Sequence, residues 1–366
     1  MTTSIHDRVI AVLSEHNDSY RETDLGRNGA LTGCELDDGE LLIELTFPYP
    51  LAGVTPTLVT QLKPMLEGIN DVQEAFIRVR HEVPITTTRE GTESILGVRQ
   101  VFCVASGKGG VGKSTTAVNL ALALQAEGAR VGLLDADIYG PSQALMLGVQ
   151  GQRPETPDGK SFNPVIAHGI SVMSMAFLLT ERSPTIWRGP MVSSAFTQML
   201  RQTNWGNLDY LVIDLPPGTG DIQLTLSQQV PVNGAVIVTT PQNIALLDAR
   251  RGIEMFRRVE VPVLGVIENM SLYCCAKCGH TEHLFGEGGG DKIAAEYDTA
   301  LLGALPLDLD IRQKADSGKP SVISDPDGSV AQMYRDIARR TGARLSMFAE
   351  RDGSSNLITK TKGIDE

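Results

Sequence analysis

The segment GKGGVGKST has the residue types and spacing needed to bind a nucleoside triphosphate. It matches the phosphate-loop pattern G-x-x-x-x-G-K-[ST] in full and stands between an apolar run and a helical stretch. Backbone amides can close around phosphate oxygens where Gly109, Gly110 and Gly112 leave room, and the start of the helix adds the positive end of its dipole. Lys113 can neutralise the β- and γ-phosphates, and the Ser114 hydroxyl can ligate magnesium. We therefore predict that ATP and Mg²⁺ bind at Gly107, Lys108, Gly109, Gly110, Val111, Gly112, Lys113, Ser114 and Thr115.

Acidic residues follow two other apolar runs. LVIDLPPGTGD places Asp214 at the end of one run, and LLDADIYGP places Asp135 and Asp137 at the end of another. The carboxyl ends of parallel strands meet at one edge of a sheet, where phosphate loops of this kind also lie. Asp214 therefore occupies a Walker B position, from which a carboxylate can hold magnesium through water.

Three of the five cysteines lie within LYCCAKCGH. Cys275 and Cys278 form C-x-x-C, and Cys274 directly precedes them. Three uses compete: a zinc site, a redox pair and an iron-sulfur site. A zinc site could recruit His280 and His283, but the usual spacer between ligand pairs is roughly 12 residues, and here it is far shorter.

The two other uses make different demands on the same segment. A redox C-x-x-C is expected at the start of a helix, whereas CAKCGH runs into glycine and histidine. An iron-sulfur cluster needs about four thiolates, of which one chain offers two in the right spacing and a dimer offers four.

The elements that position these residues follow from apolar periodicity. Five apolar runs, separated by helical stretches, are typical of strands in a parallel sheet covered on both faces: QVFCVAS, VGLLDAD, LDYLVIDLP, GAVIVTT and PVLGVIEN. After the phosphate loop, Ala117, Leu120, Ala121 and Leu124 form a helical stripe. We predict an α/β fold in which a doubly wound, mostly parallel sheet carries the nucleotide site.

A smaller unit comes first. Residues 5–16 have the apolar spacing of a helix, ALTGCEL and ELLIELTF read as strands around the turn DDG, and a further helix and strand follow in TPTLVTQLKPMLEG and VQEAFIRVRH. The next stretch, PITTTREGTES, has no apolar period. We predict a small α/β domain over 1–85, a linker over 86–98, the nucleotide-binding domain over 99–350 and a polar tail over 351–366.

Composition and net charge argue against some classes of partner. The 366 residues are 42 % hydrophobic without an apolar run long enough to span a bilayer, and the start lacks a cleavable leader pattern, so we expect a cytoplasmic protein and no membrane partner. A net charge of -12 argues against nucleic acid as a partner, because phosphate backbones are bound by basic surfaces. Five cysteines, three of them clustered, are typical of metal or redox chemistry in a reducing compartment.

The phosphate loop also carries an additional lysine, Lys108. With it, KGGVGKS resembles the deviant Walker A motif of the ParA, MinD, nitrogenase iron-protein and Mrp ATPases. The resemblance implies that Lys108 reaches the phosphates of a partner chain across a nucleotide-bound homodimer, and that Lys108, Lys113 and Asp137 carry catalysis. It further implies that Asp137 orients or deprotonates the attacking water, and that Asp135 supports the magnesium held at Ser114 and Asp214.

Two segments resemble the parts of these ATPases that contact adenine. They are VIENM, which contains Asn269, and LPLD, which contains Pro306 and Leu307. In addition, Pro216, Pro217 and Gly218 resemble a switch loop that senses the γ-phosphate.

Taken together, the motifs resemble one family over nearly the whole chain. SGKGGVGKST, DADIYGPS, DLPPGTGD, ENMS followed by C-x-x-C-G-H, and SGKP are similar to the Mrp/ApbC iron-sulfur cluster carriers. The resemblance implies an ATPase in which Cys275 and Cys278 of two subunits bridge a [4Fe-4S] cluster, with apo iron-sulfur proteins and cluster assembly factors as partners. The first unit resembles the MIP18-like domain fused to many members, although FPYPLAGVT lacks the cysteine often found in that domain.

Two alternatives remain open. A ParA- or MinD-type positioning ATPase would bind DNA or membrane, but the chain is acidic and ends in FAERDGSSNLITKTKGIDE, which has no apolar stripe. An ATPase dimer with structural zinc would keep the fold and change the metal. Iron analysis of anaerobically purified protein separates these possibilities.

Overall fold

The structure of the chain is a computed structural model that describes residues 4–86, 93–138, 140–177, 189–220, 223–226, 230–275 and 277–351. Six residues of the predicted linker, 87–92, and nearly all of the predicted tail, 352–366, lie outside these ranges.

One large sheet organises the second unit. Its eight strands run in the order β15-β12-β11-β6-β10-β7-β9-β8, and every neighbouring pair is parallel except β8 with β9. The predicted fold, a mostly parallel α/β sheet, is confirmed. The eight strands of this sheet are β6 Val98–Ala105, β7 Val131–Asp135, β8 Val165–Ala167, β9 Ile170–Ser174, β10 Leu208–Asp214, β11 Gly234–Thr239, β12 Val263–Glu268 and β15 Leu301–Ala304.

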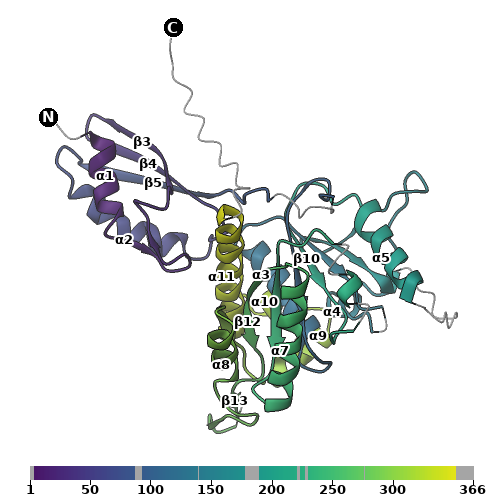
Figure 1. The fold of residues 1–366 in the computed structure, drawn as a ribbon. Helices are drawn as coiled ribbons and strands as arrows, with labels where there is room; N and C mark the ends of the chain where they lie inside the picture. Colours follow the sequence, from purple (N-terminus) through teal and green to yellow (C-terminus); the bar gives the residue numbers. More distant parts are fainter. Residues whose placement is uncertain are drawn as a thin grey trace.

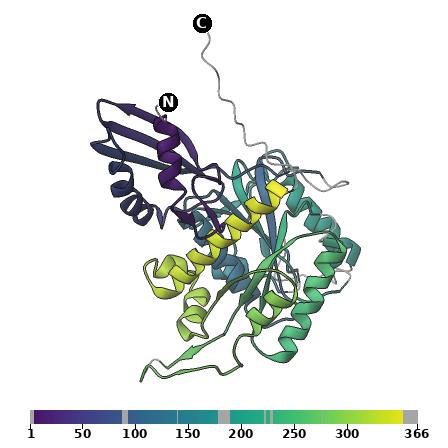
Figure 2. The same ribbon diagram turned by 60° about the vertical axis from the view of Figure 1, so that its left-hand side comes forward.

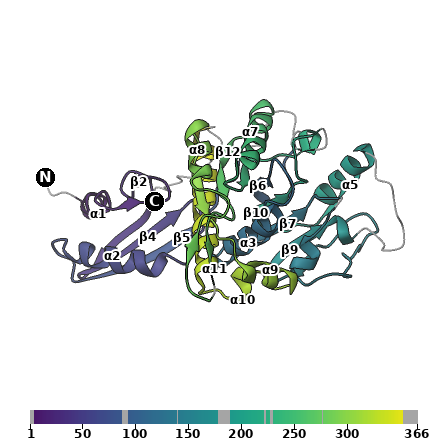
Figure 3. The ribbon, with the colours of Figure 1, turned by 90° about the horizontal axis from the view of Figure 1, so that it is seen from below.

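Helices cover both faces of this sheet (Figure 3). A separate apolar core fills each side, because the central strands are buried on both faces. One layer contains α3 Lys113–Ala126, α4 Gln143–Met146, α9 Leu309–Asp316, α10 Ser321–Ser324 and α11 Ser329–Arg351. The other contains α5 Gly189–Gln202, α7 Asn243–Arg258 and α8 Gly289–Glu296. Within the described ranges, no helix has the length and apolar composition to cross a bilayer.

Helix α3 is buried nearly all round, and not along one stripe as its sequence predicts. It packs between the sheet and the helices α10 and α11, so consecutive residues from Thr116 to Leu124 are buried. Asn119, a polar residue in the middle of this helix, has hydrogen-bond partners although it is buried. Its side chain donates to the Thr115 carbonyl at 2.9 Å and accepts from the Val322 amide at 3.2 Å. This burial holds in place the helix whose first residue is Lys113.

The small unit has its own core. Three strands in the order β3-β4-β5 form a sheet in which β3 is antiparallel and β5 parallel to β4. Helices α1 and α2 contact this sheet and each other, and a short pair of strands, β1 and β2, lies beside them. The bounds are α1 Ile5–Leu13, β1 Asn17–Asp18, β2 Thr23–Asp24, β3 Leu31–Asp37, β4 Glu40–Phe47, α2 Thr55–Glu67 and β5 Glu74–His81.

A buried ionic cluster joins the two units at the far end of α3, where α11 passes the small unit (Figures 1 and 2). Glu127 follows α3 directly, and its side chain is 0 % exposed. Its carboxylate accepts from Arg335 at 2.6 Å, from Arg339 at 2.8 Å and from the Gly53 amide of the small unit at 2.8 Å. Arg339 also donates to the Tyr20 hydroxyl at 2.7 Å. The small unit is thus attached to the helix that carries the phosphate loop.

We expect Glu127→Ala to lower the free energy of unfolding by about 3 kcal/mol, because two guanidinium groups lose their buried partner. Chemical denaturation measures the loss. As a control, Glu254→Ala removes an exposed ion pair of 3.9 Å with Arg257 and should change stability by less than about 1 kcal/mol. Equal, small effects of the two substitutions would show that the cluster does not stabilise the junction.

Candidate functional site

The phosphate loop connects β6 to α3 at the carboxyl edge of the sheet. Gly110 and Gly112 have φ values of +79° and +82°, a region that L side chains rarely adopt. A Cβ on Gly112 would also lie 2.1 Å from Asn269 Nδ2. By contrast, a Cβ on Gly110 would meet no heavy atom within 4 Å. The loop thus packs against Asn269 at Gly112 and leaves open space around Gly110. Phosphate binding through backbone amides requires such open space.

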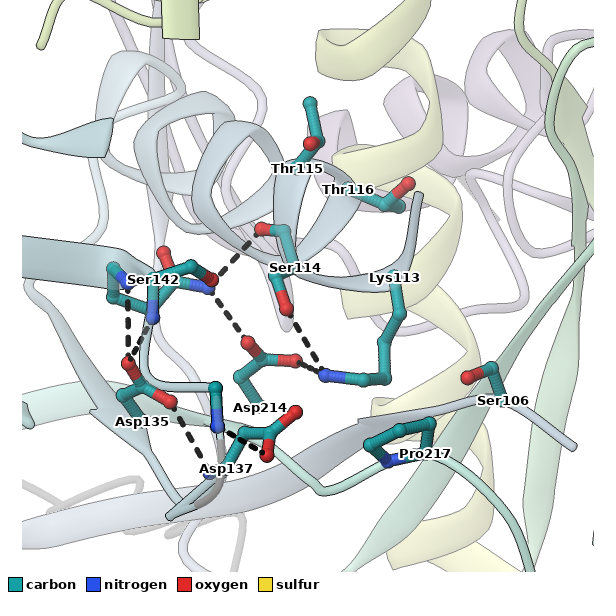
Figure 4. A network of polar contacts seen from close by, with 12 residues as sticks. Ser106, Lys113, Ser114, Thr115, Thr116, Asp135, Asp137, Ser142, Asp214 and Pro217 are labelled. Atoms are coloured by element: carbon teal, nitrogen blue, oxygen red, sulfur yellow. Dashed lines mark hydrogen bonds and ion pairs between the residues drawn. The ribbon is translucent and has the colours of Figure 1, made fainter. Parts of the chain in front are cut away.

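Lys113, Ser114 and Asp214 converge beneath the loop (Figure 4). The Lys113 ammonium donates to Asp214 Oδ1, and it donates to Ser114 Oγ at 3.1 Å. The exposed fraction is 6 % for the Lys113 side chain and 0 % for Asp214. Bound phosphates would share Lys113 with Asp214, and a magnesium ion between Ser114 and Asp214 would take over neutralising that carboxylate.

Gln143, at the start of α4, is a site residue that the sequence did not indicate. Its Nε2 donates to Asp214 Oδ2 at 2.8 Å and to the Ser114 carbonyl at 3.1 Å. Its Oε1 is buried and has no hydrogen-bond partner within the described part of the chain. Gln143 Oε1 is thus a buried acceptor close to Ser114 and Asp214. It could accept a hydrogen bond from a water molecule bound to a magnesium ion there. No motif signals this glutamine, which follows the DADIYGPS segment.

Asp135 orients the loop that follows β7. Its Oδ2 accepts from the Ser142 amide at 3.1 Å, the Gln143 amide at 3.1 Å and the Ser174 hydroxyl at 3.0 Å. Its Oδ1 accepts from the Asp137 amide at 3.1 Å. Burial first, and then the negative charge of Asp214, raise the pKa of Asp135 to about 7, while these hydrogen bonds act in the opposite direction. Such a carboxyl group suits the supporting role predicted for Asp135, behind the predicted magnesium ligands Ser114 and Asp214.

Asp137 and Lys108 lie nearer to solvent, and both are half-buried. Asp137 Oδ1 accepts from the Gly140 amide at 3.3 Å. The Lys108 carbonyl accepts from Ser106 Oγ at 2.9 Å, and the Ser106 carbonyl accepts from the Gly218 amide at 2.9 Å. The start of the phosphate loop is therefore tied to the predicted switch loop. In the described ranges Lys108 forms no ion pair within its own chain.

We expect Asp137→Asn to keep ATP binding and to slow hydrolysis by about 10²-fold or more, because an amide cannot accept a proton from the attacking water. Single-turnover hydrolysis and nucleotide titration measure the two properties separately. A near-normal rate would transfer the role to Asp135 or to the nucleotide itself.

The segments predicted to contact adenine adjoin each other. Asn269 follows β12, and Pro306 and Leu307 follow β15; the Leu305 amide donates to the Glu268 carbonyl at 2.8 Å, and the Leu307 amide donates to the Leu272 carbonyl at 2.8 Å. The Asn269 side chain, however, is buried and donates to the Val111 carbonyl at 2.9 Å. In this arrangement the Asn269 amide group fastens the phosphate loop.

The cysteines lie in a short hairpin that continues from the same edge. Its strands are β13 Tyr273–Cys274 and β14 Thr281–Glu282, and Tyr273 also bridges to Leu307. At the tip, the Cys275 amide donates to the His280 carbonyl and the Gly279 amide to the Cys275 carbonyl, both at 2.8 Å. Cys278 is exposed and Cys275 is half-buried. A pair of accessible thiols therefore lies on a projecting loop, next to the predicted base-contacting segment.

The hairpin favours a thiolate at Cys275. Backbone amides of Lys277 and Cys278 lower the pKa of Cys275, and the side chains of Cys278 and Tyr273 add further hydrogen bonds. A thiolate is the form that binds metal. Cys274 has a different environment, because its Sγ lies 3.8 Å from the Gly279 carbonyl.

The described residues of one chain form no metal site near the hairpin. Among the residues that the structure describes, no three His, Cys, Asp or Glu side chains converge in a way that could hold a metal ion. His283, a possible zinc ligand, instead contacts the Ser271 carbonyl through Nδ1 at 2.7 Å. One chain therefore presents an open pair of thiols.

Comparison with known proteins gives a consistent result. Residues 97–341 match the family model described as ParA, NUBPL iron-transfer P-loop NTPase. An iron-sulfur cluster carrier protein of Pseudomonas fragi is 55 % identical over 285 residues, which are 78 % of this chain and 99 % of the relative. An iron-sulfur cluster carrier protein of Haemophilus influenzae is 46 % identical over 345 residues, 94 % of this chain and 93 % of the relative.

A solved structure is similar as well. The nucleotide-binding protein of Archaeoglobus fulgidus in complex with ADP has a TM-score of 0.56 and 36 % sequence identity. The match covers 63 % of this chain and 90 % of that chain.

Proposed function

Because the chain belongs to the ParA family of NUBPL-type iron-transfer P-loop NTPases, we propose that it is an ATP-hydrolysing carrier that holds a [4Fe-4S] cluster between two copies of itself and delivers it to apo-proteins. One observation supports this proposal most directly. The family's phosphate loop and an exposed C-x-x-C hairpin occupy the same edge of one sheet.

Thiolate counting supports the two-chain arrangement. A cluster of this type takes about four thiolates, and Cys275 with Cys278 supplies two per chain. Cys274 lies outside the C-x-x-C spacing and so is not counted. A second copy supplies the missing pair without any new ligand type. The cluster is cargo here, since it is passed on intact.

The nucleotide part of the proposal assigns one task to each side chain. Lys113 neutralises phosphate charge, Ser114 and Asp214 hold magnesium, and Gln143 and Asp135 keep that pair in place. Magnesium, when bound, stabilises the charge that develops on the phosphates. Asp137 orients the water, and Lys108 reaches the phosphates of the second copy.

We expect Lys108→Ala to lose ATP hydrolysis, by about 10²-fold or more, and to retain ATP binding, because the lost contact belongs to the other copy's site. Hydrolysis measured against protein concentration tests this: wild type should show a rate per chain that rises with concentration, and the variant should not. Loss of ATP binding equal to that of hydrolysis would assign Lys108 to the phosphates of its own chain.

The remaining predictions concern partners and compartment. Apo iron-sulfur proteins and assembly factors are the proposed partners, and a cytoplasmic location without nucleic acid or membrane contact stays a prediction. A structural zinc dimer is the alternative that the same hairpin permits, whereas a positioning ATPase would leave the paired thiols without a use.

Anaerobic reconstitution tests the proposal as a whole. After addition of ferrous iron and sulfide, we expect about four iron and four sulfide per two chains, and a dimer by analytical ultracentrifugation. Stoichiometric zinc in place of iron, or one complete cluster on a monomer, would refute the shared site.

A further inference from the structure

The cysteine hairpin is too short to hold its own shape. Its strands β13 and β14 pair at two positions, Tyr273 with Glu282 and Cys274 with Thr281. A two-stranded hairpin on its own is marginally stable in water at best, and independent stability needs a third strand or packing against a helix. The placement of the thiols therefore depends on the contacts that hold the base of the hairpin.

The outgoing strand is attached to the loop after β15. The Ser271 amide and hydroxyl both donate to the Leu305 carbonyl, at 2.9 and 3.0 Å. The Leu307 amide donates to the Leu272 carbonyl at 2.8 Å, and Tyr273 continues this contact as a bridge to Leu307. Consecutive residues before the thiols are thus fixed to the nucleotide-binding domain.

The returning strand is attached at its end by a side chain. His283 directly follows β14, and its Nδ1 lies 2.7 Å from the Ser271 carbonyl oxygen. A carbonyl oxygen can only accept, so Nδ1 carries a proton and donates. Further along the chain, the Gly290 amide donates to the buried Glu268 carboxylate. Within the described ranges, His283 is the side chain that ties β14 to the base of the hairpin.

The other nitrogen of this ring makes a weaker contact. His283 Nε2 faces Glu287 at 3.8 Å, and the exposed fractions of the two side chains are 42 % and 78 %. Ion pairs between exposed groups contribute little. His280, the other histidine of the hairpin, is exposed, and its backbone carbonyl is the group that accepts from the Cys275 amide. The Nδ1 hydrogen bond therefore distinguishes His283 from His280.

The base of the hairpin also contacts the phosphate loop. Asn269, two positions before Ser271, donates from its buried side chain to the Val111 carbonyl at 2.9 Å. Met270 lies between them with a φ of +57°, in the left-handed region, so the chain turns sharply there. A short covalent segment with a hydrogen bond at each end thus connects the Val111 carbonyl to His283.

We propose that His283 positions the cysteine hairpin and couples it to the phosphate loop. A bound nucleotide holds the loop that contains Val111, and Val111 in turn holds Asn269. Ser271 then presents its carbonyl to His283 in a fixed position, so the hairpin opens less often. The element with two states is the hairpin itself, because its few backbone pairs are close to the limit of stability. The inference rests on the proposed function for its link to the cluster.

Substitutions that keep or remove the Nδ1 donor test the proposal. In His283→Asn the amide nitrogen is bonded to Cγ, as Nδ1 is, so a donor stays in place. In His283→Gln the amide nitrogen lies one bond further out, and in His283→Ala it is absent. His280→Ala is the matched control in the same hairpin.

Amide hydrogen exchange measures the opening of the hairpin without any iron. The amides of Cys275 and Gly279 are the probes, because both are hydrogen-bonded within the closed tip. Exchange is measured without nucleotide and with saturating ADP and Mg²⁺. ADP fills the phosphate loop without the γ-phosphate, so the response reports the loop of the same chain.

We expect His283→Ala and His283→Gln to raise both exchange rates about tenfold, the factor that corresponds to one net hydrogen bond. His283→Asn and His280→Ala should stay within about twofold of wild type. ADP should slow exchange in wild type about fivefold or more and should leave His283→Ala unchanged. Equal exchange in the Asn and Gln variants would refute the positioning role. A full response to ADP in His283→Ala would refute the coupling.

Iron release separates this inference from the proposed function. After anaerobic reconstitution, a ferrous chelator should remove iron from His283→Ala and His283→Gln about tenfold faster than from wild type and His283→Asn, in proportion to the open hairpin. Equal rates in these proteins would refute a role of His283 at the cluster. A wild-type protein that takes up no iron would overturn the proposed function, and hydrogen exchange would still decide whether His283 positions the hairpin.

Discussion

Lys113→Ala is expected to abolish ATP hydrolysis, with a loss of about 10³-fold or more, and to weaken ATP binding. Lys113 is the buried cation at the phosphate loop, where it contacts both Asp214 and Ser114. Its charge acts on phosphates in a site with little water, so an alanine cannot be compensated by solvent. Steady-state hydrolysis and titration with a fluorescent ATP analogue measure the two losses.

Stability must be separated from catalysis in this variant. The substitution leaves the Asp214 carboxylate buried without its cation, which should cost about 3 kcal/mol of folding stability. The double variant Lys113→Ala/Asp214→Asn removes that charge, and Gln143 can still donate to the amide oxygen. We expect it to recover stability but not hydrolysis. Normal turnover in either variant would exclude the phosphate-loop assignment.

The central strands and the phosphate loop could be predicted from sequence because their signals are local. An apolar run indicates a buried strand, and β6, β7, β10, β11 and β12 carry such runs. The glycines that follow β6 indicate the phosphate loop. Strands β8 and β15, with three and four residues, form the two ends of the sheet, and β9, with five residues, lies next to β8. So few paired residues predict a strand less clearly than the five longer patterns do.

The polar contacts could not be predicted, because they depend on pairs far apart in the chain. Gln143 meets Asp214 across 71 positions, and Glu127 meets Arg339 across 212. The sequence around Gln143 and Glu127 contains no motif that indicates these contacts. The contact of Glu127 with Arg339 arises only because α3 packs against α11. Asn269 shows a related difficulty: it lies next to the phosphate loop, as predicted from sequence, but its buried side chain donates to the Val111 carbonyl.

The cysteine segment could be predicted only in part. Its thiols and their spacing were evident, whereas the hairpin that presents them depends on the bridge from Tyr273 to Leu307 and on the His280 carbonyl. The C-x-x-C spacing identifies Cys275 and Cys278 as the pair. Loss of either thiol is expected to have a large effect on cluster binding.

Replacing either Cys275 or Cys278 with alanine should abolish cluster binding, with iron falling from about four per dimer toward background. Each single substitution acts twice in a dimer, so only two thiolates remain where about four are needed. ATP hydrolysis should persist, because the phosphate loop, Lys113 and Asp214 are built on other strands. Iron and sulfide analysis, with absorbance in the visible charge-transfer region, measures the first property, and phosphate release measures the second.

Cys274→Ala is the matched control, because Cys274 directly precedes Cys275 at the end of β13. Its Sγ lies 3.8 Å from the Gly279 carbonyl, and Cys274 stands outside the C-x-x-C spacing, so this variant should keep both cluster and hydrolysis. Retention of a full cluster after Cys275→Ala, together with its loss after Cys274→Ala, would move the ligand by one residue and refute the assignment. Loss of the cluster in all three variants would mean that the hairpin itself, and not its thiols, was damaged. Hydrogen-exchange protection of the Cys275 and Gly279 amides decides that point, because their bonds to His280 and within the tip persist only in an intact hairpin.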